Sequence, residues 1–535
     1  MEIIRGHITS TIIIFFLLLF CFFCSTEPGS NKYQNFILDE ITIDDIHSGY
    51  KSDKFTIKEI VKKYIDRIRE MDTNGPAINS VIMVNPDALV IADSLDQIHK
   101  KGGKKGPLFG IPVLLKDNID THDKMPTTAG SRVLKNSFPL QDSWVAMKLR
   151  EAGAVILGKT NLSEWANYRA SYSSSGWSGI AGQTKNPYVL DRNPCGSSSG
   201  SAVAVSANLC AIAIGTETWG SIMCPSNANG IVGIKPTVGL WSRTGIIPIS
   251  YTQDTAGPMA RTVKDAAILL GTITGIDVTD SKTKKSLGKR YIDYTQFLKE
   301  VNLSGKRIGY LKTMEGKNHR VDDLMYRAID DLKNIGADII ELENIVESSP
   351  GGFGAEQNSI EVMAHEFKDG LKKYLNNLGE DAPVSNLKEV IEATLADSIE
   401  MLYFNLDRLI NAQSKGDLDS EIYKESLENM LEAFRNNGID RIMDKYDLDA
   451  ITSPTGSPAW KTDLVNGDKY YISTTVYAAL SGYPNINVPM GFIGNVPVGI
   501  SFYGRAWSEP LLLQIAYTYE QNTMHRRAPK FLVTD

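Results

Sequence analysis

The sequence predicts an α/β protein: one large mixed β-sheet flanked by helices on both faces, with a helical insertion or cap. Two observations carry this prediction. Short apolar runs bounded by Gly, Pro or Asn recur between residues 108 and 275, and segments long enough for helices separate them. Strand-like runs return near the end of the chain, after a long stretch with helical patterning. We therefore expect one sheet that both ends of the chain complete.

Residues 1–24 are expected to form a leader for export to the periplasm or the cell exterior. Arg5 precedes an unbroken apolar run over residues 12–24, which is short for a bilayer span but fits a secretory signal. The alternative is a short anchor that keeps the protein attached to a membrane. Cys24 ends the run and is a candidate for lipid modification, as in a bacterial lipoprotein signal peptide. Residues 25–40 are then expected to be a polar tether.

A helix is predicted to begin at Thr56. Thr56 and Glu59 have the spacing of a capping box, and Phe55 and Ile60 are placed as a hydrophobic staple. The apolar residues that follow repeat at helical spacing and give the helix one apolar face. We expect this helix to be scaffold without a chemical role.

Seven short apolar runs are predicted to be buried strands, because they are rich in Val and Ile and end at turn-forming residues. They are residues 111–115, 154–157, 211–214, 230–234, 450–452, 485–488 and 498–502. The second run lies inside a literal match to the phosphate-binding loop pattern at residues 153–160. Its apolar centre favours a strand over a nucleotide site.

Residues from about 318 to 447 are charged and helix-patterned, most clearly at 361–375 and 420–446. We expect a variable helical region here, inserted into one catalytic domain over residues 41–525. The sequence carries no signal for the oligomeric state.

Composition excludes several classes of function. The chain has 63 acidic and 56 basic residues, with no basic stripe, so nucleic acid is not an expected partner. Five cysteines, two of them in the leader, do not make a disulfide framework. No Cys/His cluster has zinc spacing, so we expect neither a metal nor a cofactor.

The segment between Asn193 and Pro236 is rich in glycine and hydroxyl side chains. Glycine allows close approach of a ligand to the backbone, and exposed serines among backbone N–H groups suit a developing oxyanion. A serine nucleophile needs a base, which is usually a histidine. Nothing around the nearest histidines in the sequence resembles a triad partner. Lys116 follows a predicted buried strand, where desolvation would lower its pKa and allow a neutral amine to accept a proton.

These residues resemble the amidase-signature family, and the resemblance covers most of residues 40–525. Several motifs occur in the family's order: Gly196-Ser197-Ser198-Ser199-Gly200-Ser201, Gly215–Ile222, Gly233-Ile234-Lys235-Pro236-Thr237, Ser242-Arg243-Thr244-Gly245, Asp254-Thr255-Ala256-Gly257-Pro258 and Gly482-Tyr483-Pro484, with the Lys116 motif upstream. The resemblance implies an amidase-signature fold and a Ser-Ser-Lys mechanism through an acyl-enzyme.

The resemblance also assigns roles. Ser221 matches the nucleophile, Lys116 the base, and Ser197 the bridging serine, which in the family is associated with a cis peptide bond. The backbone N–H groups of Thr218, Trp219, Gly220 and Ser221 are expected to form the oxyanion hole. Ser198 is expected among the groups that bind substrate.

Two positions depart from the family pattern. Trp219 stands where Gly or Asp is usual, so its indole is expected to narrow the site or stack on substrate. Met223 replaces a common Arg behind the nucleophile. We expect Cys195 and Cys224, which lie close to the two serines in sequence, to be small buried packing residues.

The sequence therefore predicts an exported serine amidase that acts on C-terminal peptide amides or small amides. The Gly-Thr-Glu-Thr motif and the Ser-Ile-Met-Cys-Pro continuation resemble peptide amidases. The amidotransferase branch of the family works inside the cell as part of a larger complex and has no use for an export signal. Two alternatives stay open: a fatty-amide or ester hydrolase near a membrane, and a non-catalytic exported binding protein on the same fold.

Overall fold

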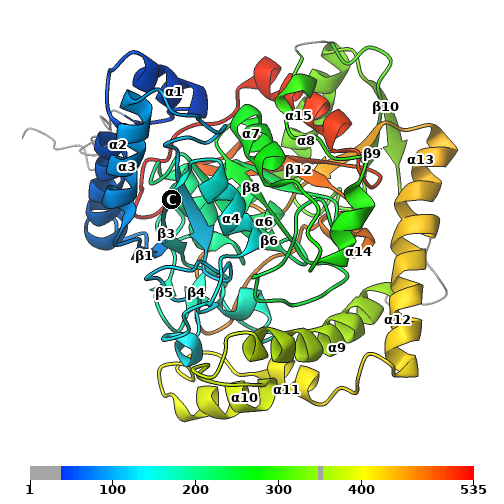
Figure 1. Cartoon of the computed structure of the whole chain (residues 1–535). Coiled ribbons are helices and arrows are strands. Elements are labelled where there is room, and N and C mark those ends of the chain that lie inside the picture. Colours follow the sequence, from blue (N-terminus) through cyan, green and yellow to red (C-terminus); the bar gives the residue numbers. More distant parts are fainter. Residues whose placement is uncertain (1–37, 300–301, 347–353) are drawn as a thin grey trace, which may run out of the picture. The chain divides into compact units, whose positions relative to one another are not determined.

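The computed structural model describes residues 38–299, 302–346 and 354–535. From Glu40 to Asp535 the chain forms one compact unit around a sheet of 11 strands (Figure 1). The predicted leader and nearly all of the predicted tether lie outside the described residues. Among the helices of the described ranges, none combines the length and the apolar character needed to cross a membrane.

The sheet is mixed, as predicted, with the strand order β1-β3-β2-β6-β8-β7-β12-β13-β11-β9-β10. The pairs β3–β2, β2–β6, β11–β9 and β9–β10 are parallel, and the other neighbours are antiparallel. The strands are β1 (Val81–Val84), β2 (Pro112–Lys116), β3 (Val155–Thr160), β6 (Ile212–Glu217), β7 (Val232–Lys235), β8 (Thr255–Ala260), β9 (Arg307–Leu311), β10 (Asp338–Leu342), β11 (Ala450–Pro454), β12 (Asn485–Ile493) and β13 (Val496–Tyr503); β4 (Trp177–Ser178) and β5 (Gly182–Gln183) pair separately.

All seven predicted runs overlap strands of this sheet, and residues 153–160 contain β3 rather than a phosphate-binding loop. Sequence patterning missed the other four strands of this sheet. β8 contains Gly257 and Pro258, which weaken a strand pattern, yet it is buried between β6 and β7. β1, β9 and β10 lie at or near the sheet edges, where charged or partly exposed residues blur the apolar run.

Helices cover both faces of the sheet (Figure 1). α5 and α6 contact each other and pack on central strands, while α4, α7, α8 and α15 form a second contacting group. The helices are α1 (Ile43–Lys51), α2 (Ile57–Arg67), α3 (Ala88–Lys100), α4 (Trp144–Glu151), α5 (Ser199–Ser206), α6 (Met223–Ala228), α7 (Val263–Ile273), α8 (His319–Asn334), α9 (Gly354–Asn376), α10 (Leu387–Ala396), α11 (Asp407–Gln413), α12 (Glu421–Leu431), α13 (Arg441–Tyr446), α14 (Val476–Ser481) and α15 (Glu509–Thr523).

The predicted start of the first long helix is confirmed at α2. Thr56 accepts a hydrogen bond from the Glu59 N–H at 3.1 Å, and the Glu59 carboxylate accepts one from the Thr56 N–H at 2.8 Å. These two bonds satisfy backbone donors that a helix N-terminus otherwise leaves open. Ile57, Ile60 and Tyr64 lie on the buried face.

The predicted helical region, residues 318–447, has two parts with different structural roles. α9 to α12 contact one another and run along one side of the sheet, at the bottom and right of Figure 1. We call these four helices the cap. The earlier part of residues 318–447 is different: α8 packs on β12, and β10 extends the sheet beside β9. The expectation of helix throughout is therefore wrong for β10.

Candidate active site

Lys116 and Ser197, two of the three candidate catalytic residues, meet where β2 and β6 end side by side. These strands are parallel neighbours, with Leu115 opposite Ile214, so their carboxyl ends lie at the same edge of the sheet. Lys116, the last residue of β2, thereby reaches Thr216 near the end of β6. The Lys116 Nζ lies 2.8 Å from Thr216 Oγ1, 3.2 Å from the Thr216 carbonyl oxygen and 2.7 Å from Ser197 Oγ.

Burial decides the protonation state of Lys116. Desolvation lowers the pKa of this fully buried amine to about 7, although the carboxylates of Glu217 and Asp254 oppose the shift. A neutral amine has two N–H donors and one lone pair. With both donors directed to Thr216, the lone pair is left for the hydroxyl of Ser197. The site can therefore hold a proton acceptor near neutral pH.

Asn118 supports this arrangement. Its Nδ2 donates to Thr216 Oγ1 at 3.0 Å, which orients the threonine that Lys116 contacts. The sequence pattern that singled out Lys116 gave Asn118 no role. Its contact with Thr216 depends on the pairing of β2 with β6, which no local pattern encodes.

Ser197 lies in a buried turn just before α5. The cis peptide bond that the family resemblance implies is present, between Gly196 and Ser197. The Ser197 carbonyl oxygen accepts a hydrogen bond from the Ser163 N–H at 3.1 Å. This turn directs the Ser197 hydroxyl toward Lys116.

Ser221 lies on the loop between β6 and α6. The carboxylate of Glu217 accepts hydrogen bonds from the N–H groups of Ile222 at 2.7 Å and Met223 at 3.0 Å, which ties the start of α6 to the end of β6. The Ser198 N–H donates to the Ser221 carbonyl oxygen at 3.1 Å. The segments that carry the two candidate serines are therefore held together by main-chain contact.

Four successive backbone donors lie on the loop that carries the candidate nucleophile. The N–H groups of Thr218, Trp219, Gly220 and Ser221 donate to no acceptor within the described part of the chain. Gly220 has a φ of 79°, and a Cβ there would lie 2.9 Å from Thr475 Oγ1. Glycine is therefore required for the loop to turn so that its donors stay open. Such donors suit an oxyanion.

A cavity of about 570 Å³ opens over Ser221. Its walls combine apolar side chains, among them Trp219, with polar groups from four separate parts of the sequence. The residues that line it include Tyr168, Trp219, Ser221, Ile249, Ile360, Met363, Asp407, Arg408, Asn411 and Asp468. Trp219 also packs against two apolar clusters.

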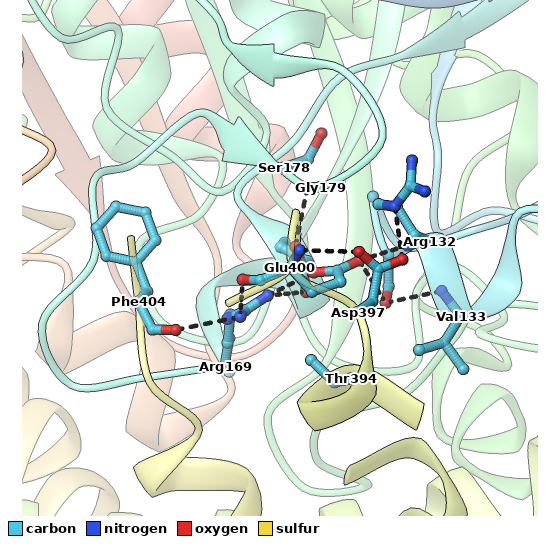
Figure 2. A network of polar contacts seen from close by, with 12 residues as sticks. Arg132, Val133, Arg169, Ser178, Gly179, Thr394, Asp397, Glu400 and Phe404 are labelled. Atoms are coloured by element: carbon cyan, nitrogen blue, oxygen red, sulfur yellow. Dashed lines mark hydrogen bonds and ion pairs between the residues drawn. The ribbon is translucent and has the colours of Figure 1, made fainter. Parts of the chain in front are cut away.

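A buried ion network joins the cap to the cavity wall (Figure 2). Arg169 Nη1 lies 2.6 Å from both the Glu164 and the Glu400 carboxylates, and all three side chains are almost fully buried. Desolvation and the neighbouring Glu400 carboxylate hold the pKa of Glu164 well above its usual range. Because Glu400 lies between α10 and α11, this network fixes the cap against the segment that contributes Tyr168 to the cavity.

Ser198 has a different place from the one expected. Its hydroxyl donates to the Thr216 carbonyl oxygen at 3.0 Å and accepts from the Thr216 N–H at 3.2 Å, and it is absent from the described cavity lining. A side chain that forms hydrogen bonds with both the N–H and the carbonyl oxygen of Thr216 supports the end of β6. The expectation of direct substrate contact does not fit this position.

Cys195 and Cys224 are buried and pack in an apolar cluster, as expected, but they also form a bond that was not predicted. The two cysteines form a disulfide, with Cα atoms 5.9 Å apart, and both contribute to the lining of the cavity. The bond links the residue two positions before Ser197 to the residue three positions after Ser221. The body of the chain has an odd number of cysteines, and the sequence does not indicate which of them stays free. This pair could therefore not be predicted from the sequence. Cys210 is the buried free one.

Comparison with known proteins agrees with this geometry. The family model described as Amidase matches residues 59–513. A protein of Arabidopsis thaliana named as a probable amidase is 41% identical over 507 residues, which are 93% of each chain. The structure of native peptide amidase from Stenotrophomonas maltophilia is 43% identical, with a TM-score of 0.88, over 92% of this chain and 99% of that one. A putative amidase of Schizosaccharomyces pombe is 34% identical in an alignment of 531 residues that covers 94% of this chain and 88% of that one.

The chain therefore belongs to the amidase family, the group of hydrolases that carry the amidase signature. It is an enzyme that acts on carbon–nitrogen bonds of amides, which sets aside the alternative of a non-catalytic binding protein.

Proposed function

We propose that this amidase hydrolyses the terminal carboxamide of short peptides with an amidated C-terminus and releases ammonia. The observation that carries the proposal is the likeness to peptide amidase, at 43% identity over 99% of that chain. A cavity of about 570 Å³ over Ser221, part apolar and part polar, is large enough for more than a simple amide.

In the first half of the proposed reaction, Ser221 Oγ attacks the carboxamide carbon. Ser197 accepts the Ser221 proton and gives its own to the lone pair of Lys116, so one proton moves along the relay. The carbonyl oxygen becomes an oxyanion, to which the N–H groups of the 218–221 loop donate. The C–N bond then breaks, and the proton returns from Lys116 through Ser197 to the leaving nitrogen as ammonia departs.

In the second half, water attacks the acyl-enzyme. The same relay takes a proton from the water and later returns it to Ser221 Oγ. The products are a free carboxylic acid and the regenerated serine. Ser197 and Lys116 thus act as base and acid in both halves.

Two other substrate classes use the same chemistry. Small carboxamides need only the 218–221 loop and the relay. Fatty amides or esters would occupy the apolar part of the cavity, formed by Trp219, Ile360 and Met363. Comparison of the three classes in one assay separates them.

We also propose that the enzyme works outside the cytosol, with Cys24 as a candidate site for a lipid anchor. The apolar run over residues 12–24 supports export, and the disulfide between Cys195 and Cys224 fits an oxidising compartment. Cell fractionation with the wild type and Cys24→Ser tests both statements. A cytosolic location for the wild type would contradict export, and an unchanged membrane fraction for Cys24→Ser would contradict the anchor.

The activity test measures ammonia release from amidated dipeptides, a simple carboxamide and a fatty amide. We expect the highest kcat/KM for the dipeptide amides, and a loss of about 10⁴-fold or more in Ser221→Ala and Lys116→Ala. Cys210→Ala is the control, because Cys210 lies in the core away from the cavity. Labelling of Ser221 by a fluorophosphonate without any ammonia release would contradict the substrate proposal but keep the nucleophile. Neither labelling nor release would contradict both.

A further inference from the structure

Helix α11 of the cap presents polar side chains to the substrate cavity. Asp407, Arg408 and Asn411 all line the cavity that contains Ser221. Residues three and four positions apart lie on one face of a helix, so Asn411 is a neighbour of both others. This face belongs to the region of the chain where sequence patterning predicted helix but no functional residue.

Arg408 has most of its donors unused. Its Nη1 donates to the Asn167 carbonyl oxygen at 3.0 Å, and this is its one hydrogen bond within the described residues, where it also forms no ion pair. A guanidinium has five N–H donors in a planar fork. The cavity is therefore lined by a partly buried cation with several donors open to an incoming ligand.

The acidic groups that face the same cavity are engaged elsewhere. Asp407 accepts two hydrogen bonds from the Ser171 N–H, at 3.0 and 3.2 Å. Asp468, on another wall, accepts from the Ser175 N–H at 2.9 Å, and burial raises its pKa to about 6. Neither carboxylate forms an ion pair with Arg408 among the described residues, so its open donors are available to acceptors on a bound substrate.

We propose that Arg408 and Asn411 bind acceptor oxygens on the acyl side of the scissile amide, so that the enzyme selects peptidyl acyl groups over simple or fatty ones. This inference rests on the proposed function. Main-chain carbonyl oxygens of a peptide are the acceptors that every such substrate offers. A hydrocarbon chain would instead leave the guanidinium and the Asn411 amide desolvated without partners, which is unfavourable.

The experiment uses four amides that share one phenyl-bearing end: 3-phenylpropionamide, acetyl-Phe-amide, acetyl-Ala-Phe-amide and acetyl-Glu-Phe-amide. Ammonia release gives kcat and KM for the full-length wild type, Arg408→Gln, Arg408→Lys and Asn411→Leu. In Arg408→Gln we expect the preference for acetyl-Ala-Phe-amide over 3-phenylpropionamide to fall about 10- to 100-fold, as loss of charge-assisted hydrogen bonds predicts. The loss should lie mainly in KM, because the contact is distant from the reacting bond.

The variants separate the two sources of the acceptor oxygen. If Arg408 binds main-chain carbonyls, Arg408→Lys recovers little of the preference for any peptide, because the fork geometry is lost. If it binds a side-chain carboxylate, Arg408→Lys recovers the preference for acetyl-Glu-Phe-amide alone, which would overturn the main-chain assignment. Asn411→Leu changes an exposed position, so it tests the same face without disturbing the core.

Lys415→Gln is the matched control. Lys415 lies two residues beyond α11, is paired with Glu361 at 2.7 Å and is absent from the described lining of the cavity. Its substrate preference should equal that of the wild type. A uniform loss of kcat across all four amides in Arg408→Gln would indicate a structural role and overturn the inference, as would an unchanged preference in both Arg408→Gln and Asn411→Leu. Inactivity of the wild type toward all four amides would instead refute the proposed function.

Discussion

At the scale of single residues, the site depends on what burial does to one lysine. An exposed lysine is protonated at neutral pH and has no lone pair to offer. The position of Lys116 at the end of a buried strand removes water from the amine, and Thr216 takes up its two N–H donors. The sequence predicted this effect from the apolar run before Lys116. It did not predict that Asn118 would orient Thr216, since that contact crosses between strands.

The pH dependence of the reaction tests this account of Lys116. The amine must be neutral to accept a proton, and its pKa lies near 7, so protonation below that pH removes the base. We expect kcat/KM for a neutral amide to rise with pH, about tenfold per unit well below pH 7, and to level off above it. A pH–rate profile between about pH 5.5 and 8.5 measures this limb. A profile that stays flat over this range would contradict a titrating base at Lys116.

Gly220 tests the loop of open donors. Its positive φ and the nearby Thr475 Oγ1 leave no room for a side chain. Gly220→Ala should therefore displace the N–H groups from the oxyanion and lower kcat by about 10²- to 10³-fold, the usual cost of a lost donor. Gly288→Ala has a similar φ of 76° with nothing near its Cβ, so it controls for backbone strain alone. Equal losses in the two variants would contradict the role of the loop.

At the scale of elements, the site is assembled from loops that leave the sheet, and covalent bonding joins two of them. The disulfide between Cys195 and Cys224 connects the turn before α5, which carries Ser197, with the start of α6, which directly follows the loop that carries Ser221. The local sequence of either cysteine gives no sign of this pairing. It arises because α5 and α6 contact each other, although α5 packs on β2, β3, β6 and β8 and α6 on β7, β12 and β13.

Reduction of this disulfide should lower both the activity and the free energy of unfolding. A dithiol donates two electrons to the bond and leaves two protein thiols, which releases the two serine loops from each other. We expect several-fold lower kcat after treatment with dithiothreitol and the same loss in the double variant Cys195→Ser/Cys224→Ser. The free energy of unfolding should fall by about 2–4 kcal/mol. Full activity of the double variant would contradict the role of the bond in holding the site.

At the scale of the whole molecule, one sheet contains strands from both the early and the late parts of the described chain. The cap runs along one side of this sheet. β7 pairs with β12 although about half of the chain separates them, and the catalytic strands β2 and β6 lie on the other side of β8. The cap has no strand of its own in this sheet. Its position relative to Ser221 depends on contacts such as the network of Arg169, Glu164 and Glu400 (Figure 2).

Loss of Arg169 should destabilise the protein strongly. Arg169→Met would leave the buried Glu164 and Glu400 side chains without their shared cation, and breaking a buried ion pair typically costs about 3–5 kcal/mol. Urea unfolding measures the change. Arg132→Met is the matched control, because Arg132 and Asp397 form a neighbouring pair in which each side chain is 28% exposed. Such a pair contributes about 0–1 kcal/mol, so equal effects of the two variants would contradict this account of the network.

The sequence by itself determined the features that local pattern encodes. Apolar runs located β2, β3 and β6, the Thr56–Glu59 spacing located the start of α2, and the ordered motifs identified the family and its three candidate catalytic residues. Each of these depends on residues that are close together in the chain. Only the tertiary structure decided the disulfide, the supporting place of Ser198, the edge strand β10 and the polar face of α11 around Arg408. The physical reason is that these features arise from contacts between distant segments, whose partners are set by the packing of the sheet and the cap.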